Sequence, residues 1–269
     1  MADFHVLTNA SERLDIPEVR QLTIGDLFGA LADGWRDFWR KPSHLAFLGL
    51  IYPVVGAALA VWSSGNNSWP LLFPLVTGFA LIGPFAALPI YEMSRRQEIG
   101  LDTHWSAAFD VFRTPAFASI AALGVWLMII FTIWLMSAQF LYETLYGPGS
   151  PPSLSAFIDE VLNKGQGQAL MLWGNLVGFG FAVLVLATGV VSIPLLLDRD
   201  VGAAVAVQTS FRVVLRNPLV IAVWGLMVVA ILLLGALPLL VGLAIAVPVL
   251  GHATWHLYRR AVVPAGDFR

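Results

Sequence analysis

Long apolar runs separated by short polar segments dominate this sequence. A helix that crosses the roughly 30 Å hydrocarbon core of a bilayer needs about 20 apolar residues. Runs of this kind occupy residues 43–62, 70–91, 116–141 and 169–197. A fifth run, 219–258, is about twice the length that one span needs. It carries Gly235-Ala236-Leu237-Pro238 near its middle, which is turn chemistry and predicts two helices joined by a very tight turn. The pattern therefore predicts six transmembrane helices.

The composition supports a membrane protein over a soluble one. Hydrophobic residues make up 58% of the chain and charged residues only 12%, whereas a soluble domain carries about 25% charged residues. A lipid-facing surface removes the need for solvating charge. Residues 1–21 lack the pattern of a signal peptide, so we expect the first span to be retained. The net charge of −2 gives no reason to expect a nucleic-acid partner, and the absence of cysteine excludes disulfides and thiolate metal sites.

The basic residues predict how the helices are oriented. Cytoplasmic loops are enriched in Lys and Arg, and the six predicted spans place 14 of the 15 basic residues on one side, with Lys164 alone on the other. We therefore expect a multi-pass membrane protein with both termini in the cytoplasm. The 14 residues are Arg13, Arg20, Arg36, Arg40, Lys41, Arg95, Arg96, Arg113, Arg199, Arg212, Arg216, Arg259, Arg260 and Arg269.

A short motif recurs before each odd-numbered span. The copies are Phe38-Trp39-Arg40-Lys41-Pro42, Val111-Phe112-Arg113-Thr114-Pro115 and Val214-Leu215-Arg216-Asn217-Pro218. The even-numbered spans repeat a weaker pattern: a proline stands eleven residues before a basic pair in two of them, Pro84 before Arg95 and Pro248 before Arg259, and Gly189 stands at a similar distance from Arg199. The sequence thus predicts an all-α fold of three repeats, each an interfacial amphipathic helix followed by a transmembrane hairpin. The repeats cover about 23–96, 102–200 and 201–261, between cytoplasmic tails at 1–22 and 262–269.

Each motif ends an amphipathic segment that we expect to lie along the cytoplasmic membrane surface. Thr23 and Asp26 form a plausible capping pair for the first segment, Thr103 caps the second, and the third follows Asp200. Arginine side chains reach the headgroups, and proline is tolerated in the first turn of the helix that follows. The predicted membrane-interface anchors are Arg40, Pro42, Arg113, Pro115, Arg216 and Pro218.

The long outer loop contains one further amphipathic helix. Leu154, Phe157, Ile158, Val161 and Leu162 recur at helical spacing, after Ser153 or Ser155 as a cap and before Gly165. This helix is expected to pack as a lid on its own bundle, to lie on the outer membrane surface or to contact a partner.

Few residues suggest chemistry. His252 and His256 have the i, i+4 spacing that can ligate a metal or lie beside a haem, although an interfacial histidine needs no ligand. Glu92 stands one turn before Arg95 and Arg96, which predicts an ion pair. No charged residue lies near a predicted bilayer midplane, which disfavours ion-coupled transport.

Asn175 is a polar residue inside the fourth predicted span, between Gly174 and Gly178. A small residue at each end of this spacing lets helices approach closely, so the amide is expected to stabilise helix packing, or else to contact a substrate. The nucleophile motif Gly-x-Ser-x-Gly and the phosphate-binding loop motifs are missing. We therefore expect no enzyme, no cofactor and no metal.

The motif Trp35-Arg36-Asp37-Phe38-Trp39-Arg40-Lys41-Pro42 and the segment Pro84-Phe85-Ala86-Ala87-Leu88-Pro89 carry a family resemblance. With the later copies of Arg-x-Pro, the chain resembles a family of uncharacterised proteobacterial six-span integral membrane proteins. This domain of unknown function is sometimes labelled as similar to cytochrome c oxidase subunit I. The resemblance implies a place in the bacterial inner membrane and association with respiratory or photosynthetic complexes. It carries over no functional residues.

Three functions remain open from the sequence. The first is a non-catalytic accessory, assembly or scaffolding subunit of a larger membrane complex, which has the bilayer and other integral membrane proteins as partners. The second is an uncoupled transporter or channel for a small or lipid-like solute. The third is a haem- or quinone-binding protein that uses His252 and His256.

Overall fold

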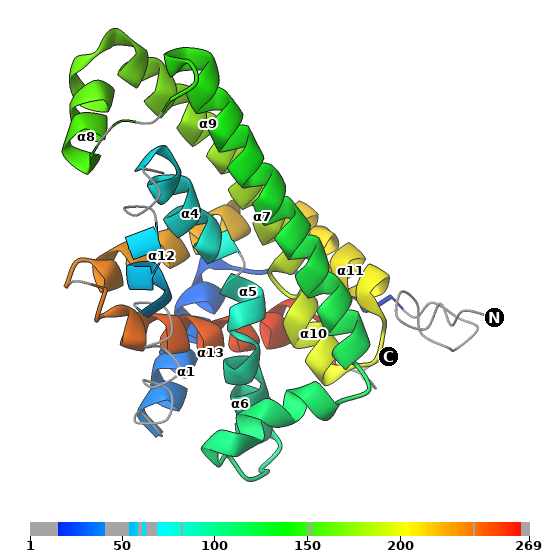
Figure 1. Ribbon diagram of the computed structural model, residues 1–269. Coiled ribbons are helices and arrows are strands. Elements are labelled where there is room, and N and C mark those ends of the chain that lie inside the picture. Colours follow the sequence, from blue (N-terminus) through cyan, green and yellow to red (C-terminus); the bar gives the residue numbers. More distant parts are fainter. Residues whose placement is uncertain are drawn as a thin grey trace. The chain divides into compact units, whose positions relative to one another are not determined.

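The computed structural model describes residues 16–40, 54–58, 61–62, 69–81, 83–149, 151, 153–238 and 240–264. Helices make up nearly all of this part of the chain (Figure 1). In order they are α1 (Ile24–Arg40), α4 (Trp69–Leu81), α5 (Gly83–Ala86), α6 (Leu88–Glu98), the 3₁₀-helix η2 (Trp105–Arg113), α7 (Phe117–Tyr146), α8 (Leu154–Asn163), α9 (Gly165–Gly189), α10 (Ser192–Asp198), α11 (Ala203–Arg216), α12 (Pro218–Ala236) and α13 (Leu243–Ala261).

The chain divides into two compact units. Unit 1 comprises Met1–Pro53, Pro84–Gly124 and Leu186–Arg269, and unit 2 comprises Val54–Gly83 and Val125–Val185. Unit 1 therefore contains α1, α5, α6, η2 and α10 to α13. Unit 2 contains α4, α8 and most of α7 and α9.

Three stretches of helix are long and apolar enough to cross a membrane: Phe117–Tyr146, Gly165–Asp198 and Pro218–Ala236. They correspond to the runs predicted at 116–141, 169–197 and the first half of 219–258. Only 33%, 44% and 17% of their most apolar windows are buried inside the protein, so most of these side chains face outward. The structure thus has the all-helical architecture expected of a polytopic membrane protein. The run at 43–62 lies largely outside the described residues.

Two predicted spans are interrupted. The prediction of one helix over 70–91 is wrong, because α4, α5 and α6 cover this run and the last break falls at Ala87. Pro89 lies in the first turn of α6, where its missing N–H leaves no hydrogen bond unmade. The run at 169–197 divides in the same way between α9 and α10, at a turn formed by Val190 and Val191.

The turn between α12 and α13 lies later than the sequence predicts. Gly235 and Ala236 still belong to α12, and the connection runs from Leu237 to Gly242. A Cβ atom on Gly242 would approach the carbonyl oxygen of Gly235 to 2.6 Å. The two chain segments meet backbone to backbone here, which explains why glycine stands at both positions.

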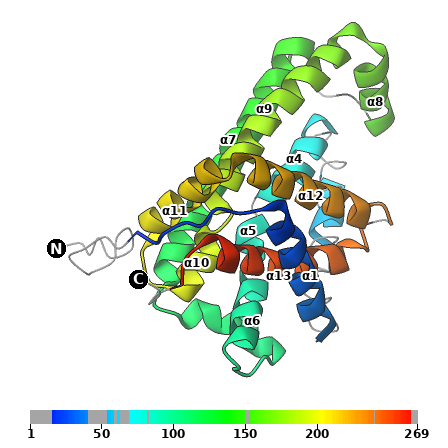
Figure 2. The same ribbon diagram turned by 180° about the vertical axis from the view of Figure 1, so that it is seen from behind.

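Helix α13 lies at the centre of unit 1. It packs against α1, α6, α10 and α12, and most of its residues are buried (Figures 1 and 2). Unit 1 contains three similar pairs of packed elements: α1 on α13, η2 on α6 and α11 on α10. Helices α6, α10 and α13 also contact one another, so the ends of three predicted even-numbered spans meet in one core.

The segment before α1 is part of this core. Val19 forms an antiparallel bridge with Val262, and the Arg20 amide donates to the carbonyl of Ala261 at 2.8 Å. The side chain of Asn217 holds the same segment, since its Oδ1 accepts from the Leu22 amide at 2.7 Å and its Nδ2 donates to the Arg20 carbonyl at 3.1 Å. The start of the described chain is thereby tied to its end.

Unit 2 is built around α7 and α9. Trp134 of α7 is buried, lies against Phe181 of α9 and donates from Nε1 to the Pro74 carbonyl of α4 at 2.9 Å. Helix α8 packs on this unit through Phe157, whose ring contacts Tyr142, and also contacts α4. Ser153 caps α8 by accepting from the Ala156 amide, as the sequence predicts.

Candidate functional site

Charged side chains from five helical elements of unit 1 form several ion-paired groups, which together we call the charged cluster. Its members are Asp33, Asp37, Glu92, Arg95, Arg96, Glu98, Asp110, Asp198, His256, Arg259 and Arg260. They come from α1, α6, η2, α10 and α13. The elements that pack around α13 are therefore joined by ion pairs as well as by apolar contacts.

Helix α1 is fastened to α13 by two carboxylates on its inner face. Asp33 accepts from Arg260 at 2.5 Å and also pairs with Arg36, while Asp37 lies 2.7 Å from Nε2 of His256. Burial alone would raise the pKa of Asp33. The hydrogen bond from Arg260, with the charges of Arg260, His256 and Arg36, outweighs burial and lowers this pKa below its ordinary value.

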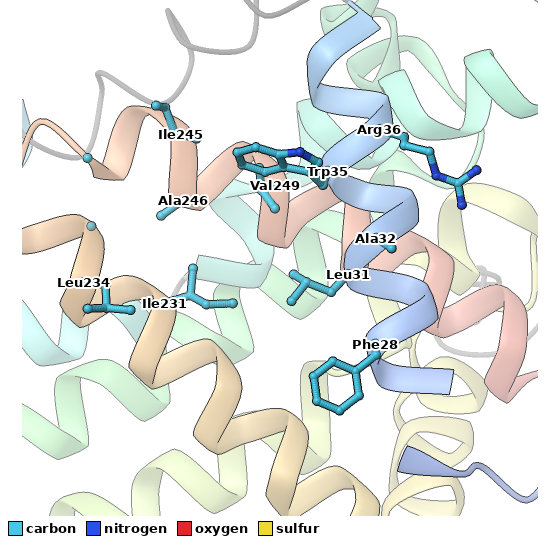
Figure 3. Close-up of a pocket in the computed structure, with 12 residues that line it drawn as sticks. Phe28, Leu31, Ala32, Trp35, Arg36, Ile231, Leu234, Ile245, Ala246 and Val249 are labelled. Atoms are coloured by element: carbon cyan, nitrogen blue, oxygen red, sulfur yellow. The ribbon is translucent and has the colours of Figure 1, made fainter. Parts of the chain in front are cut away.

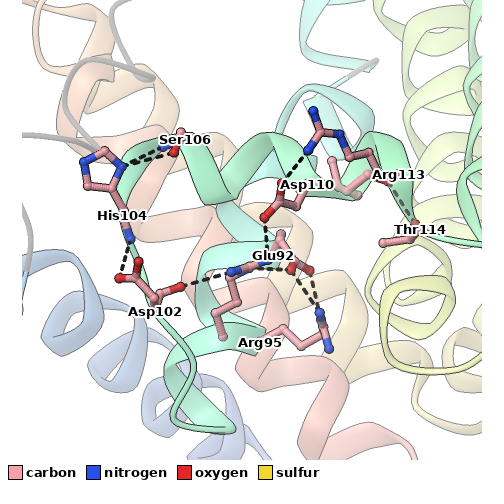
Figure 4. A network of polar contacts seen from close by, with 10 residues as sticks. Glu92, Arg95, Asp102, His104, Ser106, Asp110, Arg113 and Thr114 are labelled. Atoms are coloured by element: carbon pink, nitrogen blue, oxygen red, sulfur yellow. Dashed lines mark hydrogen bonds and ion pairs between the residues drawn. The ribbon is translucent and has the colours of Figure 1, made fainter.

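Glu92 is the most buried carboxylate of the cluster, with 1% of its side chain exposed. It accepts from Arg95 at 2.8 and 2.9 Å and from Arg96 at 2.8 Å, and Arg96 extends to Asp110 of η2 at 2.8 Å (Figure 4). These contacts confirm the predicted ion pair. The hydrogen bond to Glu92 raises the pKa of the Arg95 guanidinium above its ordinary value.

A third group of contacts joins the ends of α6, α10 and α13. Asp198 accepts from the Tyr258 hydroxyl at 2.5 Å and from Arg259 at 3.3 Å. Glu98 pairs with Arg259 at 2.9 Å and accepts from the Trp255 indole at 2.8 Å. Each carboxylate therefore has at least two donors, which is the arrangement that makes partly buried charges tolerable.

The two histidines of α13 contact different helices. His252 is fully buried and its Nδ1 lies 2.5 Å from the Ser94 hydroxyl of α6, whereas His256 bonds to Asp37 of α1. In the described part of the chain, Nε2 of His252 has no hydrogen-bond partner. No group of three or more His, Asp or Glu side chains among the described residues is arranged to hold a metal ion. The structure thus gives both histidines partners within the protein.

The arginines proposed as membrane anchors point outward. The side chain of Arg113 is 87% exposed and that of Arg40 is 64% exposed, and Arg216 is also exposed. Arg40 pairs with Asp37 and Arg113 approaches Asp110, in each case three residues earlier. Pro218 begins α12 and Pro115 precedes α7, while Pro42 lies outside the described residues.

The amphipathic segments before the motifs differ from the prediction in detail. Thr23 and Asp26 cap α1 as expected, with hydrogen bonds of 2.7 to 3.3 Å between them. The second segment is a 3₁₀-helix whose cap is His104 rather than Thr103. The third starts at Ala203, after Gly202 in a left-handed conformation, rather than directly after Asp200. Glycine adopts that backbone at no steric cost, which moves the start of the helix.

The apolar residues of α1 lie on two faces. Leu27 and Phe38 are buried in unit 1, whereas Phe28, Trp35 and Trp39 are 47–60% exposed. The single apolar face that the sequence predicts is therefore split, because Asp33 and Asp37 turn toward α13. The outer aromatic face remains available for the membrane.

An apolar groove lies between α1, α12 and α13, with a volume of about 770 Å³. Trp35 and Leu31 of α1 face Ile231 of α12 and Val249 of α13, and Arg36 projects from α1 at one side (Figure 3). The lining carries no carboxylate, hydroxyl or imidazole. A surface of this kind can hold an apolar chain but has no group for acid–base or nucleophilic chemistry.

Sequence reasoning missed Asp33, Asp37, Asp110 and Asp198, and also Ser94. One signal was present, since two motif copies place an aspartate three residues before the arginine, at Asp37 and Asp110. The partners on α13 are more than 200 positions from α1 along the chain. Periodicity within one helix cannot show such a pairing.

The known proteins offer one point of comparison. Residues 72–198 match the model of a family described as a predicted integral membrane protein (DUF2189). Comparison with curated proteins and with solved structures found no match. The matched part runs from α4 to α10 and includes two of the three stretches long enough to span a membrane. This match confirms that the chain resembles a family of uncharacterised integral membrane proteins.

Proposed function

We propose that this protein is a non-catalytic accessory, assembly or scaffolding subunit of a larger membrane complex, respiratory or photosynthetic, in the bacterial inner membrane. One observation carries the proposal. In the described structure, the side chains of the charged cluster form ion pairs with one another, and several of these pairs join different helices. Their role in the fold is therefore structural. The outward surface of the long helices is apolar. Such a molecule is suited to contacting lipid and other membrane helices.

The proposal includes six spans in three repeats, with both termini in the cytoplasm. The contacts in unit 1 support the repeats, because the segment before one hairpin packs on the end of the preceding hairpin. In this scheme η2 of the second repeat packs on α6 of the first, and α11 of the third packs on α10 of the second. Helix α1 of the first repeat packs on α13 of the third and closes the ring. The exposed Arg40, Arg113 and Arg216 would then lie together at the cytoplasmic surface.

The function is tested by isolating the protein from its native membrane. A chromosomally tagged copy is purified in mild detergent, its partners are identified by mass spectrometry, and a visible spectrum is recorded. We expect stoichiometric subunits of one membrane complex and no absorption band from the tagged subunit itself. A second tagged six-span protein of the same membrane serves as the control. Isolation of the protein without partners, in repeated preparations, would contradict the proposal.

The groove between α1, α12 and α13 favours a second candidate, an uncoupled transporter for a lipid-like solute. Its lining is apolar and it adjoins α12, a helix with few buried side chains. Proteoliposomes with a fluorescent phospholipid in one leaflet test this. Transbilayer movement that Ala246→Trp abolishes, by filling the groove, would favour transport, and no movement above that of empty vesicles would exclude it.

A further inference from the structure

Asn175 of α9 lies on the outer surface of unit 2. Helix α9 begins at Gly165, so Asn175 is about 15 Å along its axis, within a stretch long and apolar enough to cross the membrane. The residue is exposed. Its neighbours on this face are large apolar side chains that are 44–69% exposed: Leu172, Leu176, Phe179 and Val183. We call these five residues the α9 face.

The amide of Asn175 has unused hydrogen-bonding capacity. Its Nδ2 donates to the Met171 carbonyl of its own helix at 2.6 Å. Within the described structure this is the one hydrogen bond of the side chain, although an asparagine amide offers two donor hydrogens and an acceptor oxygen. The hydrocarbon core of a bilayer contains no water to hydrogen-bond these groups. An amide exposed there is therefore unfavourable unless another helix supplies a partner.

The polar side chains of α7 are satisfied within their own helix. The hydroxyls of Thr132 and Ser137 donate to carbonyls four residues earlier. A hydroxyl has one hydrogen to donate, and that hydrogen is used within the helix. The amide of Gln139 lies toward the end of α7 and donates to the carboxylate of Glu143. Asn175 differs from the two hydroxyls because it keeps both a donor and an acceptor, and from Gln139 because it is exposed among apolar side chains with no charged residue one turn away.

We infer that the α9 face is a docking surface for a second copy of this chain, with the two Asn175 amides hydrogen-bonded to each other. An amide is self-complementary, because the donor of each copy meets the acceptor of the other. Two copies inserted with the same orientation are related by a twofold axis along the membrane normal, which places both amides at the same depth. The apolar neighbours recur at spacings of three and four residues, which is the spacing of helices that pack side by side. A single polar residue at such a seam sets register and oligomeric state.

The absence of cysteine makes the test direct, since any introduced thiol is unique. Phe179→Cys places a thiol on the α9 face one turn from Asn175, and Met128→Cys places one at another exposed site, on α7, as a control. Native membranes are treated with a thiol-specific oxidant and analysed for covalent dimers. We expect a dimer of two identical chains from Phe179→Cys and little from Met128→Cys. The inference does not depend on the accessory role proposed above, so the two can fail separately.

Substitution of the amide then tests its part in the contact. Asn175→Leu in the Phe179→Cys background should weaken association roughly 3- to 30-fold, the range found for polar contacts between membrane helices. Asn175→Gln should retain most of the dimer, and Thr132→Val, the matched polar control, should retain all of it. Because Asn175 is exposed and, within the described chain, bonds only to its own helix, these variants should fold like the parent chain, which their circular dichroism spectra in detergent check. A Phe179→Cys adduct with another protein, no adduct at all, or a dimer insensitive to Asn175→Leu would each overturn the inference.

Discussion

The two units accommodate polar side chains in opposite ways. In unit 1, Glu92, Asp37 and His252 are buried. Asp37 and His252 bond to residues of another helix, and Glu92 holds Arg96, which extends to Asp110 of η2. In unit 2, Thr132, Ser137 and Asn175 bond to carbonyls of their own helices and face outward. Polar contacts between helices determine which helices pack together. A hydrogen bond within one helix only lowers the free-energy cost of a polar atom in apolar surroundings. Unit 1 is therefore the specified core, and unit 2 is the part adapted to contact with its surroundings.

Substitution of Glu92 should give the largest difference in stability between the two units. Glu92→Gln removes the negative charge and leaves Arg95 and Arg96 close together without their shared partner, at a cost of about 3–5 kcal/mol. Thermal unfolding in detergent should show a large loss of stability. Glu143→Gln at an exposed position in unit 2 is the control and should change stability by less than about 0.5 kcal/mol. Equal effects of the two substitutions would remove the distinction between the units.

Glycine substitutions should also destabilise unit 1 more than unit 2. A Cβ on Gly34 of α1 would lie 2.5 Å from the Ala253 amide nitrogen of α13, a backbone atom that cannot move aside alone. Gly34→Ala should destabilise the protein by about 1–3 kcal/mol through overpacking. A Cβ on Gly180 of α9 would meet no atom of a neighbouring element within 4 Å, so Gly180→Ala should be neutral or stabilising. Unfolding midpoints of both variants measure the difference, and a destabilising Gly180→Ala would contradict it.

Acid should weaken the contact between α1 and α13. Since the pKa of Asp33 is lowered in the folded protein, its charge stabilises the fold above the ordinary aspartate pKa of about 4. This contribution is lost as the pH falls through the lowered value. Asp33→Asn should cost about 1 kcal/mol at pH 7 and progressively less below pH 4. Unfolding of the parent chain and of Asp33→Asn is measured from pH 3 to pH 8. A stability difference between them that grows toward acid pH would contradict this prediction.

The smallest effect is expected on the outward surface of α7. Phe140 is 73% exposed, so Phe140→Leu exchanges one lipid-facing apolar side chain for another. We expect a change within about 0.5 kcal/mol. Trp134→Phe, on the inner side of the same helix, loses the hydrogen bond to the Pro74 carbonyl and should cost about 1 kcal/mol. A larger loss of stability from Phe140→Leu than from Trp134→Phe would show that the buried and exposed faces of α7 are assigned wrongly.

Sequence patterns predicted the local features and missed the distant ones. The Thr23–Asp26 cap, the Ser153 cap and the Glu92 ion pair each depend on residues within four positions, and all are confirmed. The interruption at Ala87 was missed because hydropathy records the apolar character of a run and not its backbone geometry. The pairing of Asp37 with His256 was missed because the helix period of one segment carries no information about its partner.

The link between the first and last described segments has a consequence for biosynthesis. Residues 19–22 bond to Ala261, Val262 and Asn217, and α1 rests on α13. Helix α13 follows α1 by about 200 residues, so α1 leaves the ribosome long before its binding site on α13 has been synthesised. Contacts between the two ends of a chain are also the slowest to form, because a long loop must close. The core of unit 1 can therefore be completed only after α13 has been made and inserted, and a chain truncated before α13 leaves the acidic inner face of α1 without the partners described here.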